Sequence, residues 1–366
     1  MTVAARARAA IARWDAVGAR RRATRAGALG HVDLLARGVF VSTSDGVWHR
    51  FGTPLPGHLR RSRQHVDVVG AEPSRHPVRD ALLQVARRLP PPWLFVSHGP
   101  SGPYTVVTTT FEGGLLFLEP GRSVARTIEA ASATERYAVL RRRFAEHVRC
   151  PSYRVLDDLL VEEFVAGRHP LELGEDERVA LVRRLVLDYA HLARGEWEPD
   201  PRRIVESAVD LVLRGPLPDG FPSPAELAAF VARTPEWGTV PSGADPQVNN
   251  LVVAPDGTPV PIDLGVMVLA PFFVFPVGMI ASAHGAVLAA YLDGDLDAAV
   301  GDLFASGRAA FDATPRDRVL VLALWAAVTC WYEARRLAAV DDVDRVGSLL
   351  AEQWDELELA LPGATA

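Results

Sequence analysis

The chain has 366 residues, of which 49% are hydrophobic and 23% are charged, a balance that supports a large buried core and excludes disorder of the whole chain. All 39 basic residues are arginine, so chemistry that needs a lysine amine, such as a Schiff base or a P-loop lysine, is excluded. The two cysteines, Cys150 and Cys330, are far apart in the sequence, which argues against a disulfide framework or a zinc site.

The net charge of −6 is unevenly distributed. Residues 1–100 carry 16 arginines against six acidic residues, whereas residues 101–366 carry 23 against 39. This division suggests two functional surfaces. The N-terminus lacks the apolar stretch of a signal peptide, and the longest apolar runs are interrupted by proline or too short to span a bilayer. We therefore expect a cytoplasmic protein without a membrane span.

The first hundred residues predict a helix, a hairpin and a second helix. Alanine and arginine favour a helix over 2–25, and the β-rich runs 38–43 and 47–51 flank a short turn. A helix over 77–89 ends at three successive prolines, which we take as a boundary. We expect residues 1–100 to form a basic accessory segment that packs on the next lobe. The alternative is a docking surface for an acidic partner, although nucleic acid is disfavoured because aromatic residues do not alternate with the arginines.

The next part of the chain predicts a small antiparallel sheet. Short turns separate three strands, and a helix that Ser132 or Thr134 can cap follows them and runs to about Val148. Two further strands complete the order β-β-β-α-β-β. The predicted strands are 104–111, 115–119, 123–128, 153–156 and 159–164.

From about residue 175 onward the chain predicts mainly helices. One hairpin interrupts them, with strands 251–253 and 260–262 around the turn Pro255-Asp256-Gly257. The fold class predicted is therefore α+β, with a sheet lobe followed by a helical lobe. The predicted helices are 176–194, 201–214, 224–232, 284–292, 295–306, 315–339 and 343–361.

Three polar residues flank this hairpin at a spacing that indicates phosphoryl transfer. Asp245 is followed five residues later by Asn250, and Asp263 begins an Asp-Leu-Gly sequence after the hairpin, as in kinase catalytic and metal loops. A carboxylate at Asp245 can orient an acceptor hydroxyl and take its proton. Asn250 and Asp263 offer hard oxygen ligands for Mg²⁺. Gly265 would let the backbone turn.

On these residues the chain resembles the aminoglycoside phosphotransferase family, small-molecule kinases with a protein-kinase-like fold. The resemblance covers roughly 104–366 and implies a bilobal protein, with an N-lobe and hinge at 101–166, a helical C-lobe at 167–366, and ATP and Mg²⁺ as cofactors. The segment Leu159–Gly167 looks like the family's fifth strand and hinge. In that family hinge backbone groups bind adenine, which implies contacts at Glu163, Phe164 and Val165.

The chain departs from the family pattern at two positions. Gly243 stands where the family has a histidine that braces the metal loop, and Arg126 stands where it has a lysine. Arginine can contact phosphates but is bulkier and forked. Its expected partner is Glu135, whose spacing suits this role better than that of Glu146. The loop between the first two strands would close over the phosphates through Thr109, Thr110 and Gly113.

These features favour an enzyme, an ATP-dependent phosphotransferase (kinase) that acts on a hydroxyl of a small molecule such as an antibiotic or a biosynthetic intermediate. One alternative is a kinase of serine or threonine in a peptide during modified-peptide biosynthesis. Another is a nucleotide-binding pseudokinase, in which Gly243 and Arg126 mark lost catalysis. The sequence leaves open the acceptor, the choice between ATP and GTP, and the oligomeric state.

Overall fold

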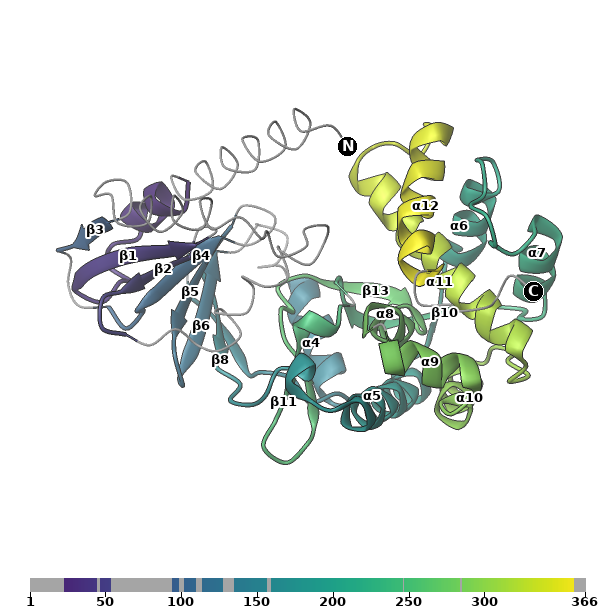
Figure 1. Cartoon of the computed structure of the whole chain (residues 1–366), viewed down its shortest axis with the longest axis horizontal. Coiled ribbons are helices and arrows are strands. Elements are labelled where there is room, and N and C mark those ends of the chain that lie inside the picture. The colour runs from purple at the N-terminus through teal and green to yellow at the C-terminus, as the bar shows by residue number, and fades with distance from the viewer. Residues whose placement is uncertain are drawn as a thin grey trace, which may run out of the picture. The chain divides into compact units, whose positions relative to one another are not determined.

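The computed structural model describes residues 23–44, 47–53, 94–98, 102–109, 114–127, 135–156, 159–245, 247–283 and 285–358. The chain divides into two compact units (Figure 1). The first comprises Met1–Ala133 and Ser152–Phe164, and the second comprises Thr134–Pro151 and Val165–Ala366. The first is built on an antiparallel sheet and the second is mainly helical, so the predicted α+β class is confirmed.

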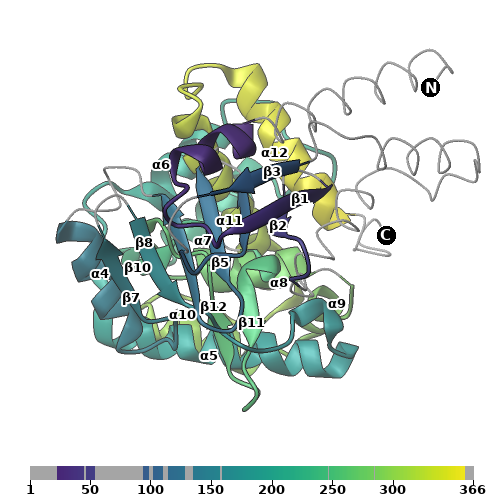
Figure 2. The same ribbon diagram turned by 90° about the vertical axis from the view of Figure 1, so that its left-hand side faces the viewer.

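The sheet of the first unit has eight strands, all paired antiparallel, in the order β3-β1-β2-β4-β5-β6-β8-β7 (Figure 2). The predicted order β-β-β-α-β-β is confirmed, as is the hairpin of β1 and β2. The strands are β1 (Gly38–Ser44), β2 (Val47–Arg50), β3 (Leu94–Ser97), β4 (Val106–Thr109), β5 (Leu115–Glu119), β6 (Ser123–Thr127), β7 (Tyr153–Leu156) and β8 (Leu159–Glu163).

The two units differ from the expected segments in two respects. Strands β1 to β3 come from the first hundred residues but are hydrogen-bonded into the same sheet as β4 to β8. Helix α4 (Glu135–Ala145) belongs to the second unit, although its sequence lies between strands of the first. The predicted helices over 2–25 and 77–89 lie almost wholly outside the described residues.

The two faces of the sheet differ in what they pack against. Alternate residues of a strand point to opposite faces, and Phe117, Ala125 and Val161 belong to one buried cluster. Residues 23–30 are helical, and Ala28 joins that cluster. Val124 packs against a second, smaller cluster. Arg126, next to Ala125, and Glu162, next to Val161, therefore lie on the face opposite the main core.

Helices make up most of the second unit, and one of them was not predicted. Helix α8 (Val274–Ala283) is buried at all but one position, so its sequence has no amphipathic stripe, and Pro276 lies in its first turn. The other helices are α5 (Glu175–Glu196), α6 (Ile204–Val212), α7 (Pro224–Ala232), α9 (Gly285–Asp293), α10 (Asp297–Ser306), α11 (Pro315–Arg336) and α12 (Val343–Glu358).

Short strands in the second unit flank the loops that carry Asp245 and Asp263. β10 (Gly238–Gly243) pairs with β13 (Met267–Pro271) and with β9 (Glu198–Pro199). β11 (Leu251–Val253) and β12 (Pro259–Pro261) form the predicted hairpin. β10 begins against an aromatic ring, since a Cβ on Gly238 would lie 1.8 Å from Trp197 Nε1.

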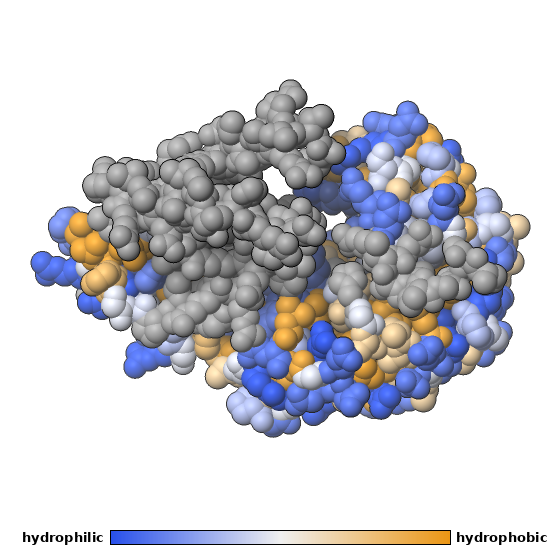
Figure 3. Space-filling model, viewed as in Figure 1, coloured by the Kyte–Doolittle hydropathy of each residue, from blue (hydrophilic) through white to orange (hydrophobic). Residues whose placement is uncertain are grey.

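Among the described residues that are coloured in Figure 3, hydrophilic and apolar residues are interspersed. Among the described residues, no single helix is both long and apolar enough to cross a membrane, and α8 with α9 meets that requirement only as a pair bent by 119°.

Candidate active site

The loop after β10 brings together two of the three residues predicted for catalysis. Asn250 ends a short 3-10 turn, η2 (Val248–Asn250), and its Nδ2 donates to Asp245 Oδ2 at 2.9 Å and to the Asp245 carbonyl at 3.3 Å. The backbone N–H of Gln247 donates to the same carbonyl at 3.0 Å. Asp245 is exposed and Asn250 is half-buried. The Asp245 carboxylate is therefore accessible and held by the Asn250 amide.

The loop after β12 lies beside the first. The Ile262 N–H donates to the carbonyl of Asn250 at 2.8 Å, and the Ala244 N–H donates to the carbonyl of Val266 at 3.2 Å. These two backbone hydrogen bonds join the segments on either side of Asp263 to the Asp245 loop. The arrangement holds Asp245, Asn250 and Asp263 on one framework within the helical unit.

The backbone of the second loop turns at Asp263 rather than at Gly265. Asp263 has a φ of 57°, in the left-handed region that costs most non-glycine residues on the order of 1–2 kcal/mol. Aspartate tolerates this region because its short side chain can hydrogen-bond locally. Gly265 is buried and is not among the residues with positive φ. The turn therefore presents the Asp263 side chain, which is exposed, to solvent.

Apolar side chains occupy the space beside Gly243. A Cβ at this position would lie 2.7 Å from Leu264 Cδ2 and 3.3 Å from Phe275 Cε2. The Phe275 ring stacks on Tyr189 of α5, with centroids 5.0 Å apart. Burial raises the pKa of Tyr189 well above its ordinary value. Where the resembled family has a histidine, this chain has Gly243 closely packed against the side chains of Leu264 and Phe275. We call these two side chains the apolar floor.

The carbonyl of Leu264 accepts a hydrogen bond from a side chain that sequence analysis did not single out. Tyr137, on α4, is 3% exposed, and its hydroxyl donates to this carbonyl at 2.9 Å. In the sequence, Tyr137 is marked only by its helical spacing with the apolar residues Leu140, Phe144 and Val148. A contact across 127 residues cannot be inferred from that periodicity.

Arg126 forms an ion pair within the sheet unit. Its Nη2 lies 3.0 Å from Glu162 Oε2, and the two side chains are 12% and 5% exposed. Glu162 lies on β8, which pairs with β6, and it was not predicted to have a role. Glu135, the partner expected for Arg126, is exposed at the first residue of α4 in the other unit. A contact between Arg126 and Glu135 stays a prediction.

The remaining residues predicted to bind nucleotide are only partly described. Thr109 ends β4 opposite Leu115, whereas Thr110 and Gly113 lie outside the described residues. In the hinge segment, the N–H of Glu163 donates to Ser152 and that of Phe164 donates to Arg122. Adenine contacts in this segment would therefore use its carbonyl groups or the N–H of Val165.

The donor set of the two loops fits Mg²⁺. Asp263 offers an exposed carboxylate. Because Asn250 uses its Nδ2 for Asp245, its amide oxygen is the atom left for a cation. Mg²⁺ is usually held by one or two such protein oxygens together with waters and substrate phosphates. Two hard oxygen ligands on adjacent loops match this requirement.

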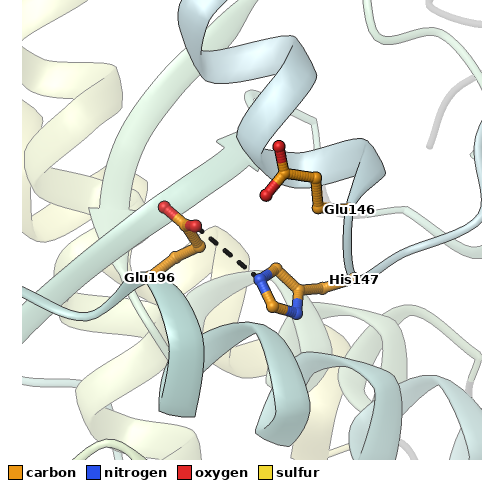
Figure 4. Close-up of side chains that lie close together, drawn as sticks. All are labelled: Glu146, His147 and Glu196. Atoms are coloured by element: carbon orange, nitrogen blue, oxygen red, sulfur yellow. Dashed lines mark ion pairs between the residues drawn. The ribbon is translucent and has the colours of Figure 1, made fainter.

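A second group of metal-ligand types, Glu146, His147 and Glu196, lies between the ends of α4 and α5 (Figure 4). His147 Nε2 is 3.7 Å from Glu196 Oε1. Arg143 also donates from Nε to Glu196, and its Nη1 lies 2.5 Å from Glu198 Oε1. Because Glu196 already pairs with Arg143 of α4, we interpret the group as an anchor of α4 on α5.

An open, acidic hollow of about 570 Å³ lies between α5 and α9. It contains none of the residues predicted for catalysis or nucleotide binding. Its charged lining is Glu175, Asp176, Arg183, Asp293 and Asp295.

No protein-family model and no curated protein matches the chain. Solved structures do match it. An aminoglycoside phosphotransferase from Streptomyces rimosus is 19% identical, with 61% of this chain and 92% of that chain covered and a TM-score of 0.36. A choline/ethanolamine kinase family protein from Mesorhizobium loti is 17% identical, with 78% and 94% covered and a TM-score of 0.47. A macrolide 2'-phosphotransferase from Brachybacterium faecium is 14% identical, with 68% and 86% covered and a TM-score of 0.41.

These structures are small-molecule kinases, the group that the sequence resembles. The residues of this chain that offer chemistry for a reaction are those of the Asp245 and Asp263 loops.

Proposed function

We propose that the protein is a kinase that transfers the terminal phosphoryl group of ATP to a hydroxyl group of a small molecule. The observation that carries the proposal is the double role of Asn250. Its side chain holds Asp245 and its carbonyl accepts from Ile262, next to Asp263. A predicted base and a predicted metal ligand thus share one rigid support.

Asp245 is the residue that would act on the acceptor. Its carboxylate orients the hydroxyl and accepts its proton as the hydroxyl oxygen bonds to the γ-phosphorus. The bond between that phosphorus and the bridging oxygen breaks, ADP leaves, and the proton passes from Asp245 to solvent. The hydrogen bond from Asn250 Nδ2 fixes one carboxylate oxygen and so limits the orientations available to Asp245.

Asp263 and the amide oxygen of Asn250 are the residues that would hold Mg²⁺. When bound, the cation would neutralise phosphate charge that develops during transfer. Asp263 is exposed at a left-handed turn, and backbone hydrogen bonds on both sides hold the loop that carries it. Preorganisation of this kind lowers the reorganisation needed during reaction.

The sheet unit carries further residues that the family resemblance implies for nucleotide binding. We propose that Arg126 contacts a phosphate of ATP and that Glu162 fixes its guanidinium. We propose that the backbone from Glu163 to Val165 contacts the adenine. Thr109, Thr110 and Gly113 are assigned to the loop over the phosphates. We place the enzyme in the cytoplasm. A hydroxyl of a peptide serine or threonine is the alternative acceptor.

One observation favours a second candidate function, a nucleotide-binding protein without transfer activity. Arg126 is engaged by a nearly buried carboxylate, which reduces the charge it offers to phosphate. The retained set of Asp245, Asn250 and Asp263 favours the enzyme, because binding alone does not need a base. The two functions differ in whether a product forms.

The test is incubation of the full chain with ATP, Mg²⁺ and a panel of hydroxylated small molecules, including cationic and macrolide-type compounds. A mass increase of one phosphoryl group on a panel member, lost in the Asp245→Asn variant, supports the kinase. ATP binding by calorimetry with no phosphorylated product from any small molecule or peptide would instead support the binding protein.

A further inference from the structure

The loop that carries Asp263 needs a support because its left-handed backbone costs some free energy even at an aspartate. Its two ends are fixed by the hydrogen bonds Ile262 N–H to Asn250 and Ala244 N–H to Val266. Between these points Asp263 adopts a left-handed conformation, and its side chain is exposed. Such a conformation persists only where the surrounding structure determines it.

Gly243 contributes no side-chain hydrogen bond to this loop, because glycine has no side chain. Leu264 instead points its side chain toward Gly243 and packs there with Phe275. This packing fixes the side chain of Leu264 but leaves its backbone carbonyl to be satisfied elsewhere, since a buried carbonyl without a partner is costly.

Tyr137 supplies that partner. Its hydroxyl donates to the Leu264 carbonyl at 2.9 Å in a buried environment. We propose that Tyr137 is a positioning residue that holds the Asp263 loop for metal binding, as the polar brace that Gly243 cannot provide. The inference rests on the proposed role of Asp263 as a Mg²⁺ ligand.

A brace is effective only if it is itself fixed, and α4 is fixed within the same unit. The helix packs against β10 and β13, the strands that lead into and out of the two loops. At its other end, Arg143 pairs with Glu196, the last residue of α5, and with Glu198 on β9. Arg141 donates to the carbonyl of Pro151 at 3.0 Å. Tyr137 therefore acts from a helix tied to the loops it supports.

The test compares Tyr137→Phe with a matched control, Tyr291→Phe. Tyr291 is also buried, and its hydroxyl donates to the carbonyl of Arg318 at the same 2.9 Å, away from the loop. Each variant loses one hydroxyl and the hydrogen bond that it donates to a backbone carbonyl, so both should melt at a slightly lower temperature than the parent protein. Only a specific effect of Tyr137 on the loop can separate them.

The first readout is the affinity for Mn²⁺ in the presence of ADP. Electron paramagnetic resonance measures this binding without turnover. Tyr137→Phe should weaken Mn²⁺ binding about threefold to tenfold, the range that loss of one hydrogen bond allows. Tyr291→Phe should leave it unchanged. In turnover, Tyr137→Phe should lower kcat with little change in the KM for the acceptor. Equal Mn²⁺ affinities in the two variants would overturn the proposal.

The second readout is amide hydrogen exchange over residues 262–267, which does not depend on metal binding. Exchange there should be faster in Tyr137→Phe than in Tyr291→Phe. If the parent protein binds no Mn²⁺ with ADP, the proposed function fails, and exchange still decides whether Tyr137 holds the loop. Unchanged exchange in Tyr137→Phe would reject the brace itself.

Discussion

Arg126 Nη2 and Glu162 Oε2 lie 3.0 Å apart, on neighbouring strands and on the sheet face opposite the main core. Both side chains are nearly buried. A buried charge without a partner is strongly unfavourable, whereas the pair as a whole contributes little. The position where the resembled family has a lysine is therefore supported here by a strand acid.

This pair predicts a double-mutant cycle. Glu162→Leu alone leaves a nearly buried guanidinium without its carboxylate, and we expect it to lower stability by about 3–5 kcal/mol. The double variant Arg126→Met/Glu162→Leu should recover most of that loss while raising the KM for ATP, because the phosphate contact is gone. Urea unfolding and steady-state kinetics measure the two effects. A double variant with the KM of the parent protein would remove Arg126 from the nucleotide site.

The role of Asp245 is tested by Asp245→Asn, which keeps the side-chain shape and removes the base. We expect nucleotide binding to persist and phosphoryl transfer to fall by about 10² to 10⁴-fold, the range for general base catalysis. The matched control is Asp256→Asn, an exposed aspartate in the turn of the neighbouring hairpin. Nucleotide affinity from calorimetry and kcat from product formation give the comparison. Similar kcat values for the two variants would contradict the assignment.

Two substitutions at Asp263 separate its charge from its backbone conformation. Asparagine tolerates a left-handed φ as well as aspartate does, so Asp263→Asn should keep the melting temperature and abolish Mg²⁺-dependent nucleotide binding. Alanine lacks a side chain that can bond locally, so Asp263→Ala should also lower stability. Thermal melts and calorimetry with and without Mg²⁺ provide the data. Mg²⁺-dependent affinity that survives in Asp263→Asn would show that another residue holds the cation.

The sequence predicted the elements whose patterns are local. Strands β4 to β8 and the hairpin of β11 and β12 are separated by recognisable turns, and the Asp245, Asn250 and Asp263 spacing is a local signal. Helix α8 escaped prediction because burial on all sides removes periodicity. Strand β10 escaped because it is buried at every position and so shows no alternation of apolar and polar residues.

The supports of the candidate site could not be predicted from local patterns either. Glu162 meets Arg126 only through the register of β6 and β8, and Tyr137 meets Leu264 only through the packing of α4. Sequence spacing suggested Glu135 as the acid for Arg126. That prediction looked for the acid on the following helix, whereas Glu162 lies on the adjacent strand β8. The residues proposed for the chemistry could be picked out in the sequence, whereas the side chains that contact them depend on tertiary structure.

Glu226 predicts a pH dependence of stability. Hydrogen bonds from the Ser223 hydroxyl, Arg316 and the Ser223 N–H lower the pKa of Glu226 from 4.5 to about 2. Because its pKa is lower in the folded state, this stabilisation is complete above about pH 4.5 and is lost as the pH falls toward 2. The melting temperature of the parent protein should exceed that of Glu226→Gln near neutral pH, with a gap that closes in this window. A gap that is constant from pH 7 to 3 would contradict the role of the carboxylate.

Placing a histidine at position 243 should lower the stability of this protein and its Mg²⁺-dependent nucleotide binding. The first side-chain carbon would already lie 2.7 Å from Leu264 Cδ2 and 3.3 Å from Phe275, so an imidazole must displace the apolar floor beneath both loops. Overpacking of this kind typically costs about 1–3 kcal/mol. It should also shift Leu264, whose carbonyl Tyr137 holds, and so weaken Mg²⁺-dependent nucleotide binding.

Gly243→Ala is the graded control, because Leu264 can move slightly to admit a methyl group, and its effects should be smaller in the same direction. Urea unfolding and calorimetry on both variants check the order. A Gly243→His variant as stable as the parent protein and more active would show that the space beside Gly243 can accept the histidine of the resembled family.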